Sequence, residues 1–274
     1  MGKIKNIPFR VFCYVLMIVF LFIYLFPLFF VANTSLKTSQ DYMLHPTSLT
    51  TTWAFDNYLT AWNKANFGAY IGNSVLYTAV CTIASLILSL LIAFPISRKY
   101  IPASGFLYVL FLCGLFLPSG LIPTFQMVLN MGLYDTKLGY MLVMTGVNAT
   151  SVFFFTGYFK SIPRELDEAA SIDGCGYLRY VLTCIIPLAQ PAMVSMGMLS
   201  MIGVWNNIVS STIYLTSETN YNITRGLFVF TGQYSNDWTL TAAGLLIVAA
   251  PLIAVYVFGQ RYIVDGVMAG GLKG

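Results

Sequence analysis

The carboxylates that could take part in chemistry are concentrated in one stretch, ELDEAASID, between residues 165 and 173. Small residues follow these acids, so another surface could approach them closely. No comparable group lies in the apolar segments, which contain no His, no Cys–His pair and no paired carboxylates. The only histidine, His45, stands in a polar loop, and the five cysteines form no CxxC pair. These residues therefore give no indication of catalysis, and we expect no catalytic residue, disulfide or metal site.

A second group of polar side chains lies inside the long apolar segments and carries no charge. Ionisable groups within a membrane mark ion and proton pathways, so their absence here argues against a carrier coupled to ions or protons. It favours either an uncharged, hydrogen-bonding solute or a purely structural role. For any single amide, hydrogen bonding between helices remains the alternative explanation. The candidate solute contacts are Gln126, Asn148, Trp205 and Asn206.

Six long charge-free segments must position these residues. The chain has 274 residues, of which 58% are hydrophobic and only 9% are charged. A soluble domain has roughly 25% charged residues, so a membrane protein is indicated. A spanning helix needs about 20 apolar residues, whereas barrel strands need about 10 and alternate in polarity. We therefore expect an all-α membrane protein with spans near 11–32, 74–96, 104–129, 138–158, 187–208 and 242–262. Pro118 and Pro123 predict a kink in the third span, either along a transport path or for packing alone.

The positions of lysine and arginine set the expected orientation. With the N-terminus inside, ten of the 14 Lys and Arg residues lie on the cytoplasmic side. This distribution predicts a multi-pass protein with both termini in the cytoplasm. The net charge of +4 follows from this topology and gives no reason to expect nucleic acid as a partner. The first outer loop, 33–73, carries spaced aromatic residues and is expected to be partly helical at the membrane interface.

The acid-rich stretch lies on the cytoplasmic side, in the loop 159–187 between the fourth and fifth spans. Ser161 and Pro163 suit the start of a helix that ends near Asp173, and the acids favour its positive N-terminal end. Gly174-Cys175-Gly176 predicts a tight turn, after which a second amphipathic piece leads into the fifth span. Such a short helix needs packing to be stable. It could be a lid on the chain's own helices, or a knob that fits a groove on a cytoplasmic partner.

A resemblance to a known family separates these two readings. The segment EAASIDG (168–174), followed by Pro187 and Pro191, resembles the EAA loop of bacterial ABC importer permeases. The segments SIPRELDEAA, WNN, GQY and QRYIVDGVMAGGLKG are similar to the carbohydrate-importer branch, and in particular to its maltose-permease-like second subunit. Cys175 and Val181 depart from the usual residues of this loop. The resemblance implies one permease domain over 1–274, with a first helix at 11–32, core helices within 70–262, the EAA loop at 159–187 and a cytoplasmic tail at 263–274.

The resemblance also implies partners and residue roles. The partners would be a second, homologous permease subunit, a cytoplasmic ABC ATPase dimer and an extracytoplasmic solute-binding protein, all in or at the bacterial cytoplasmic membrane with its lipid. The loop helix would couple to the ATPase, with Glu168 forming an ion pair, Ala169, Ala170 and Gly174 allowing close approach, and Asp173 holding the turn or capping the second piece. The tail residues Gly270, Gly271 and Lys273 would also contact the ATPase.

The expected function is therefore a non-catalytic subunit that forms half of the pathway of an ATP-driven carbohydrate importer, with an oligosaccharide as substrate. The sequence has no G-x-x-x-x-G-K-[ST] motif, so ATP and magnesium would be bound by the partner and this chain would hold no cofactor. One alternative is an ABC permease for another solute, such as a glycerol-phosphate compound. A second alternative, from another class of protein, is a self-contained channel or carrier, which would not co-purify with an ATPase.

Overall fold

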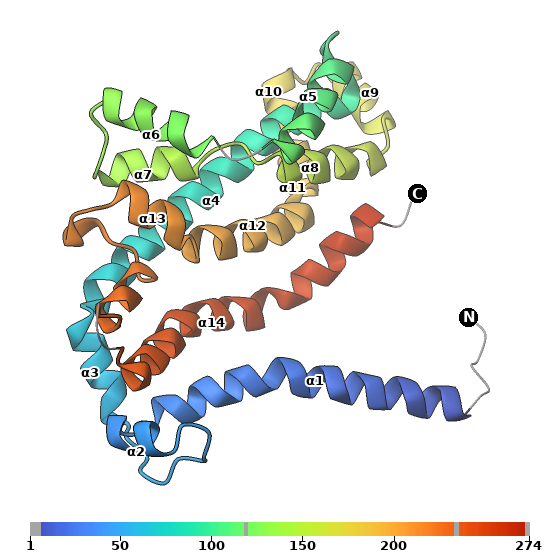
Figure 1. Ribbon diagram of the computed structural model, residues 1–274. Coiled ribbons are helices and arrows are strands. Elements are labelled where there is room, and N and C mark those ends of the chain that lie inside the picture. Colours follow the sequence, from blue (N-terminus) through green and yellow to red (C-terminus); the bar gives the residue numbers. More distant parts are fainter. Residues whose placement is uncertain (1–6, 118–119, 233–235, 272–274) are drawn as a thin grey trace. The chain divides into compact units, whose positions relative to one another are not determined.

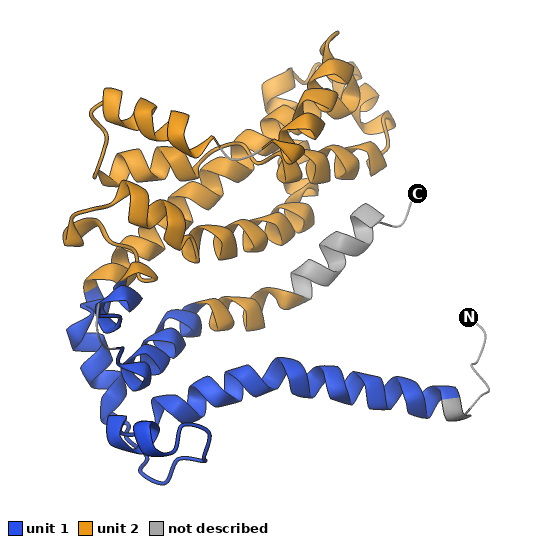
Figure 2. Cartoon of the chain, viewed as in Figure 1, with its two compact units in different colours: residues 1–68, 226–251 blue, residues 69–225, 252–274 orange. Residues whose placement is uncertain are grey.

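The computed structural model describes residues 7–117, 120–232 and 236–271, and it is built almost wholly of helices (Figure 1). Within these ranges the only β pairing is an isolated bridge between Thr231 and Asn236. The all-α class expected from the sequence is therefore confirmed. The chain divides into two compact units, residues 1–68 with 226–251 and residues 69–225 with 252–274 (Figure 2).

Unit 1 contains the N-terminal helix, the first outer loop and the start of the last helix. Its elements are α1 (Ile7–Ser35), α2 (Ser39–Leu44), α3 (Asp56–Lys64), the first residues of α4 (Phe67–Arg98), the 3-10 segment η3 (Arg225–Phe230) and the first part of α14 (Trp238–Gly271). The expected partly helical outer loop is thus confirmed by α2 and α3. Lys37 fastens this loop: its side chain is fully buried and Nζ donates to the carbonyls of His45 (2.5 Å) and Pro46 (3.2 Å).

Unit 2 contains the remaining helices, the acid-rich stretch and the candidate solute contacts. Its elements are the rest of α4, α5 (Ser104–Phe116), α6 (Leu121–Asn130), α7 (Lys137–Met144), α8 (Ala149–Ser161), α9 (Glu165–Ile172), α10 (Tyr177–Tyr180), a π-helical turn η1 (Val181–Ile185), α11 (Ile186–Leu188), α12 (Gln190–Trp205), α13 (Ile208–Tyr214), η2 (Glu218–Asn220) and the end of α14. Large aromatic and aliphatic side chains of α4, α8 and η1 form its main core, including Phe94, Phe155, Phe159 and Ile185.

Continuous helices account for only three of the six expected spans. Among the described residues, Phe9–Ser35, Phe67–Arg98 and Trp238–Gln260 are long and apolar enough to cross a membrane. The other three are bent helix pairs, so the count reaches six only if each pair is one span. The break between α5 and α6, with a bend of 103°, lies in the segment where prolines predicted a kink, although Pro118 itself is outside the described residues.

A break inside the segment 138–158 was not expected, because this segment was expected as a single helix, but α7 and α8 meet at 48°. The break of 74° between Tyr177–Leu188 and Gln190–Trp205 lies near Pro187, where a second amphipathic piece was expected to lead into the fifth span. The first of these breaks falls before Asn148, whose side chain accepts a hydrogen bond from Thr150 N (2.9 Å) and so begins a new helix. Asparagine offers the backbone this alternative to a continuous helix, and apolarity alone does not reveal it.

Candidate functional site

The helix α9 carries the acid-rich stretch, and three of its four first-turn positions are acidic: Glu165, Asp167 and Glu168. Carboxylates there stabilise the positive end of the helix. The expectation that Ser161 caps this helix is wrong. Ser161 is instead the last residue of α8, and its Oγ donates to Tyr158 O (2.7 Å). The extended residue Ile162, directly before Pro163, separates the two helices, because a residue that precedes proline avoids the helical conformation.

The turn after α9 has the geometry that the glycines predicted. Gly174 has φ +69°, its N–H donates to Ser171 O (3.1 Å), and Cys175 N donates to Ala170 O (2.9 Å). This pair of bonds is a Schellman motif, which satisfies the last carbonyls of a helix and needs a left-handed residue. Asp173 does not cap the second piece: α10 begins after Gly176, with no side-chain cap. The turn is therefore held by the backbone, and Asp173 leaves its carboxylate exposed.

The inner face of α9 is tied to the end of α4 by a buried ion pair. Arg98 Nε lies 2.8 Å from Asp167 Oδ2, and the two side chains are 2% and 12% exposed. Arg98 Nη1 also donates to Ile162 O (3.0 Å), just before α9. Tyr180 completes the site from the other side, because its hydroxyl donates to Asp167 Oδ1 at 2.5 Å. We refer to Arg98, Asp167 and Tyr180 as the tether.

Sequence reasoning missed the tether. Arg98 had served only to set topology, and Asp167 had been placed among the acids at the helix end. The available signal was spacing: Asp167 and Ala170 lie three residues apart, hence on one face of a helix, and both are partly buried. Burial raises the pKa of the neighbouring Tyr100, and the negative charge of Asp167 raises it further. The phenol of Tyr100 therefore stays protonated near neutral pH.

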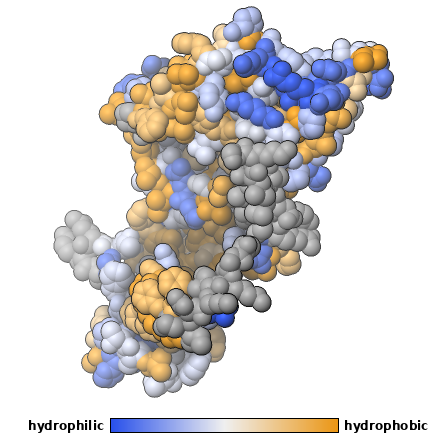
Figure 3. All heavy atoms as spheres, turned by 90° about the vertical axis from the view of Figure 1, so that its right-hand side faces the viewer, coloured by the Kyte–Doolittle hydropathy of each residue, from blue (hydrophilic) through white to orange (hydrophobic). Residues whose placement is uncertain are grey.

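The outer face of α9 is open to solvent. Glu168, Ala169 and Ile172 are exposed, and Ile172 retains 86% of its surface. Leu166 on α9 and Leu178 on α10 are also exposed, at 44% and 65%. In Figure 3 hydrophilic residues gather at the upper end of the molecule, where Figure 1 places α9 and α10. Acidic and apolar side chains thus share a projecting surface, while the tether fixes the opposite face.

The four solute-contact candidates do not come together. A cavity of about 330 Å³ in unit 2 is lined by Asn148 but not by Gln126, Trp205 or Asn206. Gln126 and Asn206 are exposed elsewhere, and Trp205 is buried. The neighbour Asn207 lines the cavity instead. The other polar side chains on its wall are hydroxyls: Ser85, Thr150, Ser151 and Ser200.

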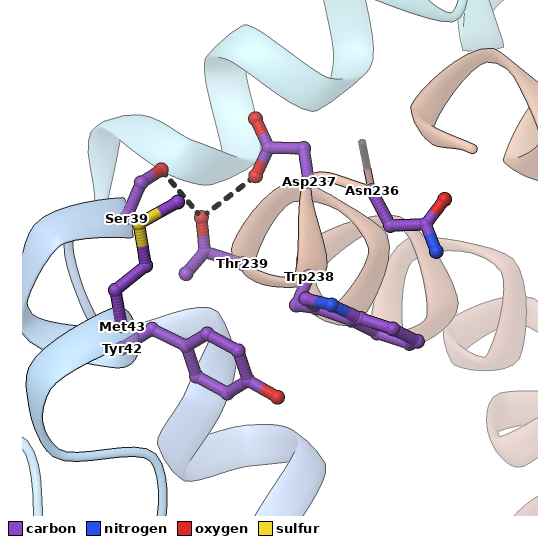
Figure 4. Close-up of a pocket in the computed structure, with 7 residues that line it drawn as sticks. All are labelled: Ser39, Tyr42, Met43, Asn236, Asp237, Trp238 and Thr239. Carbon is purple, nitrogen blue, oxygen red and sulfur yellow. Dashed lines mark hydrogen bonds between the residues drawn. The ribbon is translucent and has the colours of Figure 1, made fainter. Parts of the chain in front are cut away.

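A second hollow lies in unit 1, between α2 and the start of α14. It measures about 490 Å³ and is lined by Ser39, Tyr42, Met43 and residues 236–239 (Figure 4). Asp237 begins α14 by accepting from Leu240 N (3.1 Å) and Thr239 Oγ1 (3.0 Å), and Thr239 also meets Ser39 (3.4 Å). These polar groups form hydrogen bonds with one another, so they are better explained by capping of α14 than by a ligand site.

The structure offers no metal site within its described ranges, where no three His, Cys, Asp or Glu side chains gather closely enough to hold an ion. In the C-terminal tail, α14 runs through Gly270 and Gly271, and Lys273 lies outside the described residues. The structure therefore leaves the role expected for the tail as a prediction.

An all-α chain with long apolar helices, a small polar cavity and a projecting acidic helix has the features of a membrane transport subunit. The chain belongs to the family described as the binding-protein-dependent transport system inner membrane component, whose model matches residues 85–268. This range covers more than half of the 274 residues.

Relatives and a solved structure agree with this assignment. The chain is 33% identical to the probable ABC transporter permease protein YurM of Bacillus subtilis, over 93% of this chain and 87% of the relative. It is 28% identical to the diacetylchitobiose uptake system permease protein NgcG of Streptomyces coelicolor, over 94% and 87%. Its fold matches a chain of a bacterial ABC transporter that imports the acidic polysaccharide alginate, with TM-score 0.84, 22% identity and coverage of 96% and 99%.

Proposed function

We propose that this chain is a permease subunit of an ATP-driven, binding-protein-dependent importer of carbohydrates, with an oligosaccharide as its substrate. It forms half of the translocation path, and a second, homologous permease subunit forms the other half. A cytoplasmic ABC ATPase dimer supplies the energy and binds ATP and magnesium, while this chain is not catalytic. A solute-binding protein delivers the sugar from outside, and both termini of the chain lie in the cytoplasm.

The observation that carries this proposal is the construction of α9. Its inner face is locked to α4 through the tether, while Glu168 and Ala169 stand exposed on its outer face. A helix built in this way can receive a push on one face and pass it to a long helix through the other. Relatives with sugar names, among them NgcG, support carbohydrate as the substrate class.

The residues divide the coupling task as follows. Glu168 pairs with a basic residue of the ATPase groove, and Ala169 lets the two surfaces approach closely. Ala170 faces inward, where it packs against the unit 2 core, so its small size serves the seating of α9. Gly174 makes the left-handed turn, and Asp173 offers an exposed carboxylate beside it. Gly270, Gly271 and Lys273 form a second contact with the ATPase.

The test is charge reversal in the complete transporter, reconstituted in lipid vesicles with its binding protein. Glu168→Lys should abolish sugar-stimulated ATP hydrolysis while leaving membrane insertion intact, because the ion pair with the groove becomes a repulsion. The matched control is Glu218→Lys, which reverses another exposed carboxylate, in η2 of unit 2, and should retain stimulation. Full stimulation in Glu168→Lys would refute the coupling role. Purification of the chain without an ATPase would favour a self-contained carrier.

A further inference from the structure

Two helix breaks in unit 2 meet at the same cavity. One separates α7 from α8 at residues 145–148, and the other separates α12 from α13 at residues 206–207. Asn148 begins α8, Asn207 begins α13, and both line the 330 Å³ cavity. Within a membrane protein, broken helices are tolerated where the freed backbone groups face protein or a polar cavity. The coincidence of two breaks at one cavity therefore calls for an explanation beyond packing.

The two asparagines use the same half of their amide to begin their helices. Asn148 Oδ1 accepts from Thr150 N (2.9 Å), and Asn207 Oδ1 accepts from Ser210 N (2.8 Å). The oxygen of each amide is thus used by its own helix. Neither Nδ2 group has a hydrogen bond to any residue that the structure describes. An amide nitrogen carries two N–H donors, so each asparagine keeps its donors for another partner.

A largely buried serine adds a third polar group. Ser151 is only 3% exposed and lines the same cavity, and its hydroxyl makes no hydrogen bond within the described ranges. Ser85, on α4, uses its hydroxyl for Gly146 O at 3.3 Å, which leaves its oxygen able to accept. Asn148 is exposed and Asn207 is half-buried, so their amide donors are open to a ligand in the cavity. Amide donors and hydroxyls around one cavity therefore give a polar ligand several groups to bind.

The wall also excludes one kind of ligand. No charged side chain lines the cavity, whose remaining surface is contributed by methionine, leucine, valine and glycine residues. A carboxylate placed there would lose its hydration without gaining a cationic partner, which is strongly unfavourable. Hydroxyl and ring oxygens of an uncharged sugar would instead accept from the amide N–H groups. At about 330 Å³ the cavity is at the lower end of ligand sites, so it suits one sugar unit and not a whole oligosaccharide.

We propose that this cavity is a contact site for one uncharged sugar unit of the substrate, held by the side-chain N–H groups of Asn148 and Asn207 and by the hydroxyl of Ser151. This inference rests on the proposed function, and it deepens that function by assigning neutral glycans as the substrate class. Uronate oligomers, which carry a carboxylate on every unit, would find no cation on the wall that this chain supplies. The chain would thus share the fold of an alginate importer subunit while serving a chemically different sugar.

The test uses variants that remove the amide N–H donors of the two asparagines but keep their helix-capping role. Serine is as good an N-cap as asparagine but has no amide nitrogen, so Asn148→Ser and Asn207→Ser keep the helix starts and remove the donors. The matched control is Asn206→Ser, at a neighbouring exposed residue that does not line the cavity. Ser151→Ala removes the buried hydroxyl in a helix interior, where alanine is well tolerated, and it serves if either asparagine variant fails to assemble.

The measurement is initial uptake into vesicles that contain the complete transporter and its binding protein. The probes are labelled diacetylchitobiose and raffinose as neutral sugars, and an oligouronate of matching length. For the neutral probe that the parent transports, Asn148→Ser, Asn207→Ser and Ser151→Ala should each raise the half-saturating concentration or lower the maximal rate at least fivefold. Asn206→Ser should match the parent, and the oligouronate should not be transported.

The outcomes distinguish this inference from the function on which it rests. Parental uptake in Asn148→Ser, Asn207→Ser and Ser151→Ala would overturn the contact site and leave the permease function standing. Transport of the oligouronate in preference to both neutral sugars would overturn the neutral class, again without harm to the carbohydrate function. Absence of uptake for every carbohydrate, with ATP hydrolysis stimulated by another solute, would overturn both.

Discussion

Two carboxylates of unit 2, Asp167 and Asp135, hold their loops in opposite ways. Asp167 is paired with a cation, Arg98 Nε at 2.8 Å, and with the hydroxyl of Tyr180 at 2.5 Å. Among the described residues, Asp135, between α6 and α7, meets only neutral donors: the backbone N–H groups of Thr216 (2.8 Å) and Ser217 (2.9 Å), the Ser217 hydroxyl and Asn220 Nδ2 (3.5 Å). One loop is thus fastened by an opposite charge and the other by backbone dipoles.

The difference shows what each fastening can do. The Asp167 pair joins α9 to α4, so a force on α9 reaches a helix of 32 residues. The Asp135 contacts join the loop between α6 and α7 to the loop after α13 and involve no long helix. Burial works against ionisation of Asp135, but the hydrogen bonds from Ser217 and Thr216 prevail and hold its pKa well below the usual range. We therefore expect the first fastening to transmit movement and the second to hold the shape of its loops.

Among the changes that test this comparison, removal of Arg98 should have the largest effect on stability and on coupling. Arg98→Met leaves Asp167 buried without its cation, which costs about 3–5 kcal/mol of folding free energy. We expect a lowered thermal unfolding midpoint and loss of sugar-stimulated ATP hydrolysis in the complete transporter. Arg98→Met combined with Asp167→Asn should recover much of the midpoint, because no charge is left unpaired. Lys99→Met, at an exposed neighbour, is the control, and equal behaviour of Lys99→Met and Arg98→Met would contradict the tether.

Removal of the phenol hydroxyl should weaken the tether without unpairing a charge. Tyr180→Phe deletes a hydrogen bond to a carboxylate, worth about 2 kcal/mol, while the ring keeps its packing. We expect a smaller fall in unfolding midpoint than in Arg98→Met, with partial loss of coupling. A phenylalanine variant that couples fully would show that the arginine alone positions α9. The comparison of stimulated with unstimulated ATP hydrolysis measures this.

The left-handed turn after α9 offers a test at the backbone. Gly174→Ala should cost about 1–2 kcal/mol, because an L-residue is strained at φ +69°. A methyl group there meets no atom within 4 Å, so the cost is conformational and not steric crowding. Gly176→Ala is the matched control, since Gly176 has φ −63° and equally open space. Equal unfolding midpoints for the two alanine variants would refute the Schellman geometry.

The smallest effect is expected at Asp135 and should depend on pH. Because its pKa is lowered on folding, the ionised carboxylate adds stability above the usual aspartate pKa, and this stability is lost as pH falls below that range. Asp135→Asn should cost about 1 kcal/mol at neutral pH and flatten the decline in unfolding midpoint under acid. Asp173→Asn, at an exposed carboxylate without such bonds, should leave the decline unchanged. The midpoint measured against pH decides between these results.

Composition and periodicity were sufficient for the helical class, the positions of the long apolar segments and the Gly174 turn. These depend on local properties, namely the length of an apolar run and the backbone freedom of one residue. The breaks before Asn148 and Asn207 were missed because a charge-free interval measures apolarity and not continuity. Asparagine inside such an interval can bond within its own helix or start a new one, and the interval alone does not distinguish the two.

The tether was out of reach for a different reason. Arg98 and Asp167 are 69 positions apart in the chain, and their pairing depends on how α4, α8 and α9 pack. Each residue had an adequate local explanation, as a topology determinant or as a helix-end acid, so nothing in the sequence demanded a second role. Among the solute candidates, Asn148 was found because it is an isolated amide in an apolar run. Asn207, which lines the same cavity, was not selected as a candidate, whereas the adjacent residues Trp205 and Asn206 were.

The isolation of α1 has a consequence for how the protein is made. No side chain in the most apolar window of Phe9–Ser35 is buried against the rest of the described chain. Its favourable transfer into the bilayer thus comes from lipid alone and does not await later helices. α1 can therefore be inserted and oriented by its flanking positive residues before the helices that follow it in the chain are synthesised. The orientation of every following helix is then set before the core exists.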